Sequence, residues 1–208
     1  MRLQGLVQRI ILRMARIGIY AGTFDPIHVG HISFALQSIS AARLDKIYFV
    51  PERRPRNKQH VEHFAHRVAM IKRAIKPYRK FSVLELVDVN FSIGRTLPEL
   101  LQLFPGNELV FLFGSDIVAN IANWEHSEKL LSGELVIGLR NEDSRDVLHS
   151  IVEAWPVQPR LVTVFASYAP KVSSGRVREA LRTGQPAEGL LTSVERYSNK
   201  NWLYVNLA

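Results

Sequence analysis

The sequence of 208 residues contains no cysteine at all. This absence excludes a disulfide framework, a zinc site built on thiolates and a cysteine nucleophile. It agrees with a cytoplasmic protein, which is the location we expect. With 47% hydrophobic and 22% charged residues, the rest of the composition is that of an ordinary soluble globular protein, and the length fits one domain.

Acidic residues are missing from the first sixteen positions, where arginines alternate with aliphatic residues at helical spacing. We interpret residues 1–16 as a basic N-terminal extension and residues 17–208 as a single domain. Arg9 and Arg13 interrupt the apolar stretch, which argues against a secretory signal, and the segment is too short and too charged to cross a bilayer. A basic amphipathic helix at a membrane surface or a targeting segment is the alternative interpretation. Because Met14 stands just before the first predicted strand, it is the expected start of the native chain.

Positive charge is in excess, with a formal net charge of +8 at pH 7. Such an excess is compatible with a nucleic acid, an anionic membrane or a small phosphorylated substrate. The basic residues are spread along the chain except for a cluster at 53–58, and no basic stripe with interleaved aromatic residues appears. Composition alone does not choose among these partners, but the scattered charge argues against a nucleic acid, and we expect neither nucleic acid nor membrane as a partner. The sequence indicates nothing about the oligomeric state.

No internal repeat or low-complexity tract is present, and short apolar runs alternate with segments of helical spacing. The runs cover residues 17–20, 46–50, 81–84, 109–113, 135–139 and 161–165. The helical segments cover residues 32–43, 64–74, 96–104, 124–131, 172–181 and 190–197. This alternation indicates βαβ units and a parallel sheet buried on both faces. The predicted fold class is α/β, a three-layer Rossmann-like domain that binds ligands beyond the carboxyl ends of its strands.

The most informative stretch follows the first apolar run and reads Gly22-Thr23-Phe24-Asp25-Pro26-Ile27-His28-Val29-Gly30-His31. It predicts a tight glycine turn between a buried strand and a helix. Without a side chain, Gly22 lets the backbone approach a bulky anion, and free N–H groups at the helix start form a cradle for phosphate. His28 and His31, three residues apart, are expected on one helix face and within reach of the same phosphate. The stretch therefore points to chemistry on a nucleoside triphosphate.

A second candidate stretch, Val172-Ser173-Ser174-Gly175-Arg176-Val177-Arg178, follows the last predicted strand. Two hydroxyls at a helix start are also explained as simple caps. Together with the guanidinium of Arg178 one turn further on, they form a good grip for a triphosphate.

Both stretches resemble signatures of the adenylyltransferase and cytidylyltransferase superfamily. The first matches every fixed position of Gly-x-Phe-x-Pro-x-His-x-Gly-His, and the second is similar to Ile-Ser-Ser-Thr-x-Ile-Arg, with Gly175 in place of the threonine. From residue 17 onward the order of motifs resembles the bacterial nicotinate-mononucleotide adenylyltransferases. The resemblance implies a nucleotidyltransferase-type fold and adenylyl transfer from ATP to nicotinate mononucleotide. The products would be nicotinate adenine dinucleotide and pyrophosphate, in NAD biosynthesis.

The resemblance also implies roles for individual residues. The implied catalytic residues are His28, His31 and Arg178. The implied ATP-binding residues are these three with Gly22, Thr23, Phe24, Gly114, Asp116, Ser173 and Ser174, and the implied acceptor-binding residues are Lys58, Thr96, Trp124 and Arg140. Asp116 would accept hydrogen bonds from a ribose, and Trp124 would stack on the pyridine. We expect Mg²⁺ to come with ATP, held by substrate and water rather than by a protein metal site.

Besides Gly175, two segments depart from the family pattern. In the loop at 51–58, which resembles the family's Pro-x-x-x-Pro-Pro-His-Lys, Arg56 and Asn57 stand in place of the second proline and the histidine. Aligned on Thr96, the places of the family's Ser-Tyr-Thr hold Phe91, Ser92 and Ile93. Nicotinamide mononucleotide or another phosphomonoester, such as phosphopantetheine, is therefore the alternative acceptor. Pantetheine-phosphate adenylyltransferases share the glycine loop but typically carry threonine at the place of the first histidine.

Other readings of the sequence are a cytidylyltransferase, a fragment of an aminoacyl-tRNA synthetase, an RNA-binding protein and a non-catalytic nucleotide-binding relative. The chain is too short for the anticodon-reading parts of a synthetase. Intact His28, His31 and Arg178 favour an enzyme over a relative that has lost catalysis.

Overall fold

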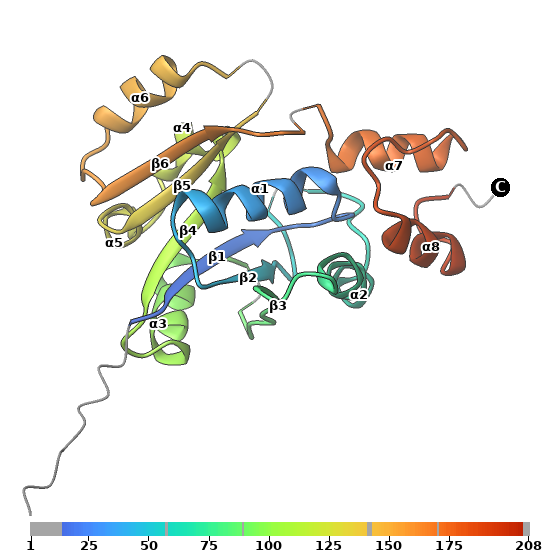
Figure 1. Cartoon of the computed structure of the whole chain (residues 1–208), viewed down its shortest axis with the longest axis horizontal. Helices are drawn as coiled ribbons and strands as arrows, with labels where there is room; N and C mark the ends of the chain where they lie inside the picture. The colour runs from blue at the N-terminus through green and yellow to red at the C-terminus, as the bar shows by residue number, and fades with distance from the viewer. Residues whose placement is uncertain (1–13, 57, 89, 141–142, 170, 206–208) are drawn as a thin grey trace, which may run out of the picture.

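The computed structural model describes residues 14–205 except 57, 89, 141–142 and 170. Its centre is a parallel sheet of six strands in the order β3-β2-β1-β4-β5-β6 (Figure 1). The strands are β1 (Arg16–Gly22), β2 (Lys46–Pro51), β3 (Phe81–Val83), β4 (Glu108–Gly114), β5 (Glu134–Leu139) and β6 (Leu161–Ala166). Each strand coincides with one of the apolar runs, so the predicted α/β fold class is confirmed.

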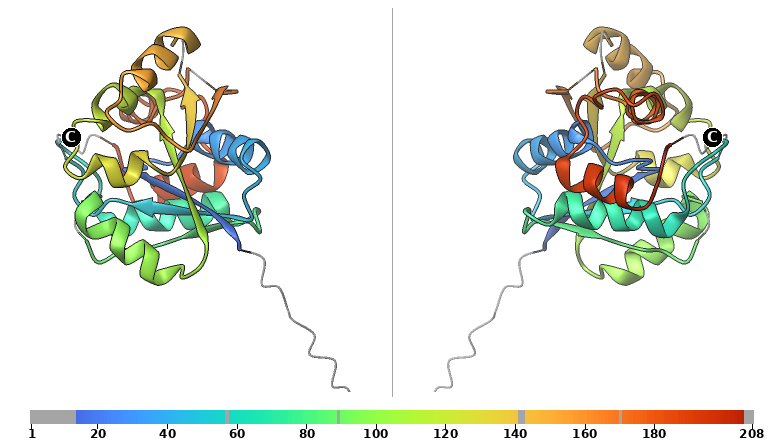
Figure 2. Two further views of the ribbon diagram at one scale, coloured as in Figure 1. Left: turned by 90° about the vertical axis from the view of Figure 1, so that its left-hand side faces the viewer. Right: turned by 90° about the vertical axis from the view of Figure 1, so that its right-hand side faces the viewer.

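Helices cover both faces of the sheet, which makes three layers (Figures 1 and 2). One face carries α1 (Val29–Ala41) and α2 (Phe64–Ile75), with α8 (Thr192–Lys200) lying beside α2. The other face carries α3 (Ile93–Leu103), α4 (Val118–Ile121), α5 (Ser127–Leu131) and α6 (Arg145–Glu153). A short 3₁₀ turn, η1 (Ser115–Ile117), links β4 to α4, and α7 (Ser174–Arg182) lies beyond the carboxyl end of the sheet.

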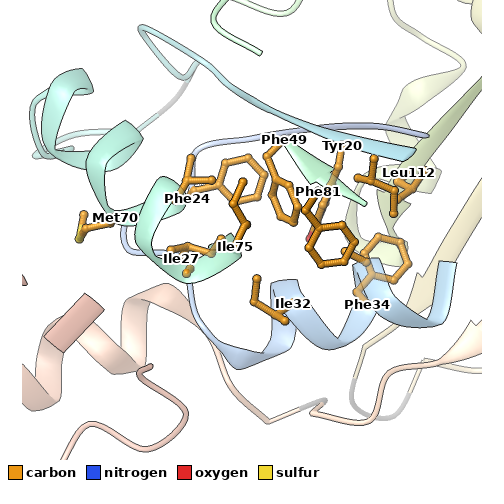
Figure 3. Close-up of a cluster of buried hydrophobic side chains, with 14 of the residues drawn as sticks. Tyr20, Phe24, Ile27, Ile32, Phe34, Phe49, Met70, Ile75, Phe81 and Leu112 are labelled. Carbon is orange, nitrogen blue, oxygen red and sulfur yellow. The ribbon is translucent and has the colours of Figure 1, made fainter. Parts of the chain in front are cut away.

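The alternation of side chains along each strand divides the core into two clusters. In β1, Ile17 and Ile19 point toward α3, whereas Tyr20 points toward α1 and α2. Burial on both faces explains why the strands read as nearly continuous apolar runs. Figure 3 shows the cluster on the α1 face, in which Phe24, Phe34 and other aromatic rings surround Tyr20.

Four charged side chains cluster at the amino ends of the strands. The guanidinium of Arg16 contacts the carboxylates of Glu108 and Glu134, and the guanidinium of Arg160 contacts the same two carboxylates. The Glu134 side chain is only 3% exposed, and a carboxylate so buried requires paired cations. Because these side chains fill the space at the amino ends of the strands, a ligand site is expected at the carboxyl ends.

Several helix boundaries differ from the prediction. The first helix begins at Val29 rather than at residue 32, and the segment predicted over 124–131 is helical only from Ser127. Helix α6 was not predicted, although its apolar residues lie on one face. No helix among residues 14–205, apart from the five undescribed positions, is long and apolar enough to cross a membrane. Most of the predicted N-terminal extension lies outside the described residues.

Candidate active site

A cavity of about 930 Å³ opens at the carboxyl edge of the sheet, where the strand order reverses between β1 and β4. Open α/β sheets bind ligands at this point. The structure brings together here all but one of the site residues named from the sequence: Gly22, Thr23, Phe24, His28, His31, Lys58, Gly114, Asp116, Trp124, Arg140, Ser173, Ser174 and Arg178 line the cavity. The exception is Thr96.

The turn after β1 depends on Phe24 as well as on Gly22. Gly22 is the last residue of the strand, where it pairs with Pro51. A Cβ atom on Gly22 would stand 3.1 Å from the ring of Phe24, so the glycine lets this ring fold back under the strand end. Phe24 has a φ of 51°, a conformation that non-glycine residues rarely adopt, and its ring is 2% exposed. Burial of the ring therefore holds the loop in its shape.

The two histidines form a reciprocal cap at the start of α1. His28 is the N-cap residue and not a member of the helix face, and its Nδ1 accepts the N–H of Gly30 at 3.1 Å. The Nδ1 of His31 accepts the N–H of His28 at 3.2 Å, and the two rings lie 3.8 Å apart. The prediction of free backbone amides at the helix start is therefore wrong for Val29 and Gly30. The N–H of Val29 is bound to the carbonyl of Gly189, and the N–H of Gly30 is bound to the ring of His28.

Both imidazoles are neutral at pH 7 in the free protein. Burial and the cation of Arg140 lower the pKa of His28 to about 4. Burial, followed by the His28 ring and the cations of Arg140 and Lys58, lowers the pKa of His31 well below its ordinary value. Because each Nδ1 accepts a backbone N–H, the single proton of each neutral ring lies on Nε2. The pair thus offers two hydrogen-bond donors of fixed tautomer.

Asp25 joins the glycine loop to the far end of the chain. An Nη1 hydrogen of Arg178 is accepted by the carbonyl of Asp25 at 2.5 Å, and the same Nη1 lies 3.8 Å from its carboxylate. The hydroxyl of Ser174 donates to the carbonyl of Pro26 at 2.9 Å, and the hydroxyl of Tyr204 donates to Asp25 Oδ1 at 2.6 Å. Helix α7 and the C-terminal segment are therefore fixed to the loop that carries the histidines.

Arg67 is the structural hub that sequence reasoning did not assign. Its side chain is 1% exposed and donates to the carbonyls of Thr23, Glu52, Arg53 and Glu62 at 2.7–3.1 Å. One guanidinium thus ties the loop after β1 to the loop after β2. The signal in the sequence was a charge within the apolar stripe of α2, where a cation must be paired to be buried.

The loop after β2 places positive charge at the cavity. The Nζ of Lys58 donates to the hydroxyl of Thr23 at 2.9 Å, and the exposed Arg56 lines the same cavity. Glu52 also lines the cavity, and its carboxylate accepts the N–H of Phe91 at 3.4 Å. Anionic ligands therefore meet a cationic wall from this loop.

An ion pair lies across Gly114 at the end of β4. The guanidinium of Arg140 stands 3.3 Å from the carboxylate of Asp116, and both side chains are about half exposed. A Cβ atom on Gly114 would lie 2.5 Å from Asp116 Oδ1 and 2.9 Å from Arg140 Nε. Glycine lets the two charged side chains meet directly above the strand end, and a side chain there would displace their flexible ends. Both remain open to a ligand in the cavity.

Aromatic rings line the side of the cavity nearest α3 and α4. Trp124 is partly buried and packs edge-to-face on Phe113, with ring centres 6.3 Å apart, and Phe91 lies on the same side. This side presents flat apolar surface, in contrast to the charged and polar side at α1 and α7. The two ends of the cavity thus suit a heterocyclic ring and a phosphate chain.

Thr96 does not line the large cavity. Its side chain is 1% exposed, and its Oγ1 accepts the N–H of Ser92 at 2.9 Å and donates to Asp88 at 3.2 Å. Asp88 also forms an ion pair with the exposed Arg95. Thr96 therefore fixes the start of α3, because its hydroxyl is committed to that turn.

Within the described ranges, no group of three or more histidine, aspartate or glutamate side chains is arranged to hold a metal ion. Asp25 and Asp116, the aspartates on the cavity wall, are engaged with Arg178 and Arg140.

Comparison with known proteins gives one consistent family. A family model described as cytidylyltransferase-like matches residues 19–180. A protein of Halalkalibacterium halodurans named "Probable nicotinate-nucleotide adenylyltransferase" is 34% identical over 92% of this chain and 92% of its own length. The nicotinate-nucleotide adenylyltransferase of Bacillus subtilis is 32% identical over 92% of this chain and 99% of its own length.

Solved structures show the same fold. Plasmodium falciparum nicotinic acid mononucleotide adenylyltransferase complexed with APC superposes with a TM-score of 0.75 at 22% identity, over 91% of this chain and 97% of that one. The same protein complexed with NaAD gives a TM-score of 0.74 at 23% identity, with the same coverage.

Proposed function

We propose that this chain, which belongs to the cytidylyltransferase-like family and within it to the nicotinate-nucleotide adenylyltransferases, transfers the adenylyl group of ATP to nicotinate mononucleotide. The products are nicotinate adenine dinucleotide and pyrophosphate, and the reaction is a step of NAD biosynthesis. The observation that carries this proposal is a single cavity with a polar, cationic end and an aromatic end.

The mechanism needs no general base. The phosphate monoester of the acceptor has a second pKa of about 6 and is already ionised near neutral pH, so it can attack the α-phosphorus of ATP directly. Catalysis then consists of orienting the two nucleotides in line and stabilising the charge of the transferring and leaving phosphates. This matches a site whose two imidazoles are donors and not proton acceptors.

His28, His31 and Arg178 are the proposed catalytic residues. The two Nε2–H groups stabilise negative charge on the α-phosphate and on the departing pyrophosphate. Arg178 and Lys58 grip phosphate oxygens, and Ser173, the N-cap of α7, presents its hydroxyl beside them. Because Arg178 and His28 are held to one loop, the donors are in place before ATP binds.

We place the ribose of ATP at the end of β4 and the pyridine of the acceptor on the aromatic side of the cavity. Asp116 accepts hydrogen bonds from the ribose of ATP, and Gly114 leaves room for that sugar. Trp124 stacks on the pyridine of the acceptor, and Arg140 moves from Asp116 to an anionic group when both substrates are present. Arg140 can change partner in this way because the side chains of Arg140 and Asp116 are both about half exposed.

Mg²⁺ is the cofactor that ATP requires. The donor set around the cavity is rich in imidazole, hydroxyl and guanidinium groups, and its aspartates are engaged by arginines. This set fits an ion that arrives on ATP, coordinated by phosphate oxygens and water. When bound, Mg²⁺ neutralises part of the charge on the pyrophosphate. The residues that hold ATP with its ion are then Lys58, Ser173, Ser174 and Arg178.

The departure at Phe91 makes the acceptor the sharpest point to test. A pyrophosphate-release assay with ATP and Mg²⁺ should compare nicotinate mononucleotide, nicotinamide mononucleotide and phosphopantetheine at equal concentrations. We expect the highest kcat/KM with nicotinate mononucleotide. A higher kcat/KM with nicotinamide mononucleotide would identify that compound as the acceptor. If no pyrophosphate were released with any of the three acceptors, the proposed adenylyltransferase activity would be refuted.

We further propose that the enzyme acts in the cytoplasm on small-molecule nucleotides alone. The absence of cysteine supports this location, and a cavity lined by cationic and polar groups at one end and by aromatic rings at the other supports these partners.

A further inference from the structure

Tyr20 is a residue of the central strand β1, and it forms part of the floor of the cavity. It is 8% exposed, with its ring packed against Phe24, Phe34 and Phe49 at centre-to-centre distances of 5.2–5.4 Å (Figure 3). Packing on three sides fixes the direction of the ring. Tyr20 also lines the cavity, so its small exposed surface faces the place of the ligand.

The hydroxyl of Tyr20 has no hydrogen-bond partner among the described residues. Two fully enclosed side-chain polar atoms there lack a partner, Ser33 Oγ and Trp155 Nε1. The Tyr20 oxygen is not one of them, so it is open to the cavity. A phenylalanine would fill the same space among the rings, so the hydroxyl adds nothing to the packing. The partner open to it is a group that enters the cavity.

The position of Tyr20 indicates which part of the ligand it meets. Its side chain is on the α1 face of the sheet, and its ring centre lies 6.1 Å from that of His31. Phe113 and Trp124 belong to the opposite face. Burial raises the pKa of Tyr20, and Arg140 and Asp116 are near enough to influence it, so the hydroxyl stays protonated and serves as a donor. It therefore lies beside His31, on the side of the cavity that carries the phosphate-binding candidates.

We infer that the Tyr20 hydroxyl binds the nucleoside triphosphate, donating its proton to an oxygen of the sugar-phosphate part. The inference deepens the proposed function and rests on it for naming this ligand as ATP. Tyr20 thus adds a specific contact below the histidines, at a place where the ring alone would satisfy packing.

The test is the variant Tyr20→Phe, which removes one oxygen and keeps the ring. Titration calorimetry with ATP and Mg²⁺, without acceptor, should show a dissociation constant about three- to tenfold larger than for the wild type, the range expected for one hydrogen bond. The dissociation constant for nicotinate mononucleotide should stay within twofold. The Tm of the free protein should stay nearly the same, because the hydroxyl has no partner among the described residues and the ring is kept.

Tyr48→Phe is the matched control. Tyr48 is on β2, packs on Phe104 with ring centres 4.8 Å apart and does not line the cavity, so neither nucleotide should bind it differently. Equal ATP affinity in Tyr20→Phe and the wild type would overturn the inference. So would a lower Tm with equal weakening of both nucleotides, which is the result of a purely structural role. Failure of the proposed reaction is seen separately, as wild-type protein that binds ATP but releases no pyrophosphate with any acceptor.

Discussion

The two ends of the cavity are built on different physical principles. The phosphate end, formed by His28, His31, Ser173, Ser174 and Arg178, is held by hydrogen bonds to backbone groups and by a buried carboxylate. The aromatic end, formed by Phe91, Phe113 and Trp124, is held by ring packing. Groups that stabilise charge in a transition state must be fixed beforehand, whereas a stacking platform tolerates variation.

This difference agrees with where the sequence follows the family pattern and where it departs. The glycine loop matches every fixed position, and its side chains are tied by Asp25 and Arg67 to segments from across the chain. The departures at Phe91 and Ile93 fall on the aromatic end and on the start of α3. A change in the first region disturbs many partners at once, and a change in the second disturbs few.

The largest expected effect comes from removing one donor at the phosphate end. His31→Ala should lower kcat about 100- to 1000-fold, the usual loss for one transition-state donor. The KM for the acceptor should change little. The reciprocal cap on α1 is also lost, which is worth about 1 kcal/mol, so circular dichroism should show an intact fold. Steady-state kinetics by pyrophosphate release provides the measurement.

His66→Ala is a suitable control, because the Nδ1 of His66 is also hydrogen-bonded, with the hydroxyl of Tyr197 as its partner, but His66 does not line the cavity. It should turn over at the wild-type rate. If His31→Ala kept near-full turnover, the ring of His31 would have no catalytic role. The phosphate end would then not be the more sensitive of the two ends to substitution.

Removing the platform at the other end should separate the substrates. Trp124→Ala should weaken nicotinate mononucleotide about 10- to 100-fold, the range for loss of one aromatic stacking contact, and leave ATP affinity within twofold. Trp124→Phe should restore most of the affinity because it keeps a ring. Calorimetric titration of each nucleotide measures both constants. Equal weakening of both would mean that Trp124 supports the fold rather than the acceptor.

Acid should distinguish the two ends, because only the phosphate end has imidazoles of lowered pKa. The pKa of His28 is about 4 when folded and 6.5 when free, so between these values the unfolded chain binds a proton that the folded chain does not. The free energy of unfolding is therefore highest above pH 6.5 and falls as the pH drops toward 4. At pH 5 the loss from this group is about 2 kcal/mol.

His28→Asn provides the comparison, since asparagine is a good N-cap and does not titrate. Urea unfolding at pH 7.5 and pH 5 should show a smaller acid loss in the variant than in the wild type. An identical loss would show that the imidazole is not the source.

The sequence predicted the parts of this site that depend on local pattern. The six strands follow from apolar runs, and the shared edge for Gly22, Gly114 and Arg140 follows from where strands end. It did not predict the hub at Arg67 or the contact of Tyr204 with Asp25, 179 residues away, because such contacts exist only in the folded chain. The local turn that holds Thr96 through Ser92 and Asp88, outside the large cavity, was not predicted either.

The position of His28 was missed for a local reason. A helix face was expected from the spacing of the two histidines, but an imidazole Nδ1 can accept a backbone N–H as a cap does. Spacing alone does not tell a first-turn residue from an N-cap. Backbone amides counted as free for phosphate were therefore already used.

The smallest expected effect tests the one departure within the phosphate end. Gly175 stands in the first turn of α7 where the family signature has threonine, and a Cβ atom there would meet nothing closer than Ser173 Oγ at 3.9 Å. Gly175→Thr should fit without strain and lower the KM for ATP two- to fivefold by adding a hydroxyl, as one neutral hydrogen bond allows. Gly175→Ala also adds a Cβ atom but no hydroxyl, and its gain in helix propensity exceeds that of threonine. If neither variant changed the KM for ATP, the phosphate end would already be complete without the missing threonine, and its donors would be those that the glycine loop and Arg178 supply.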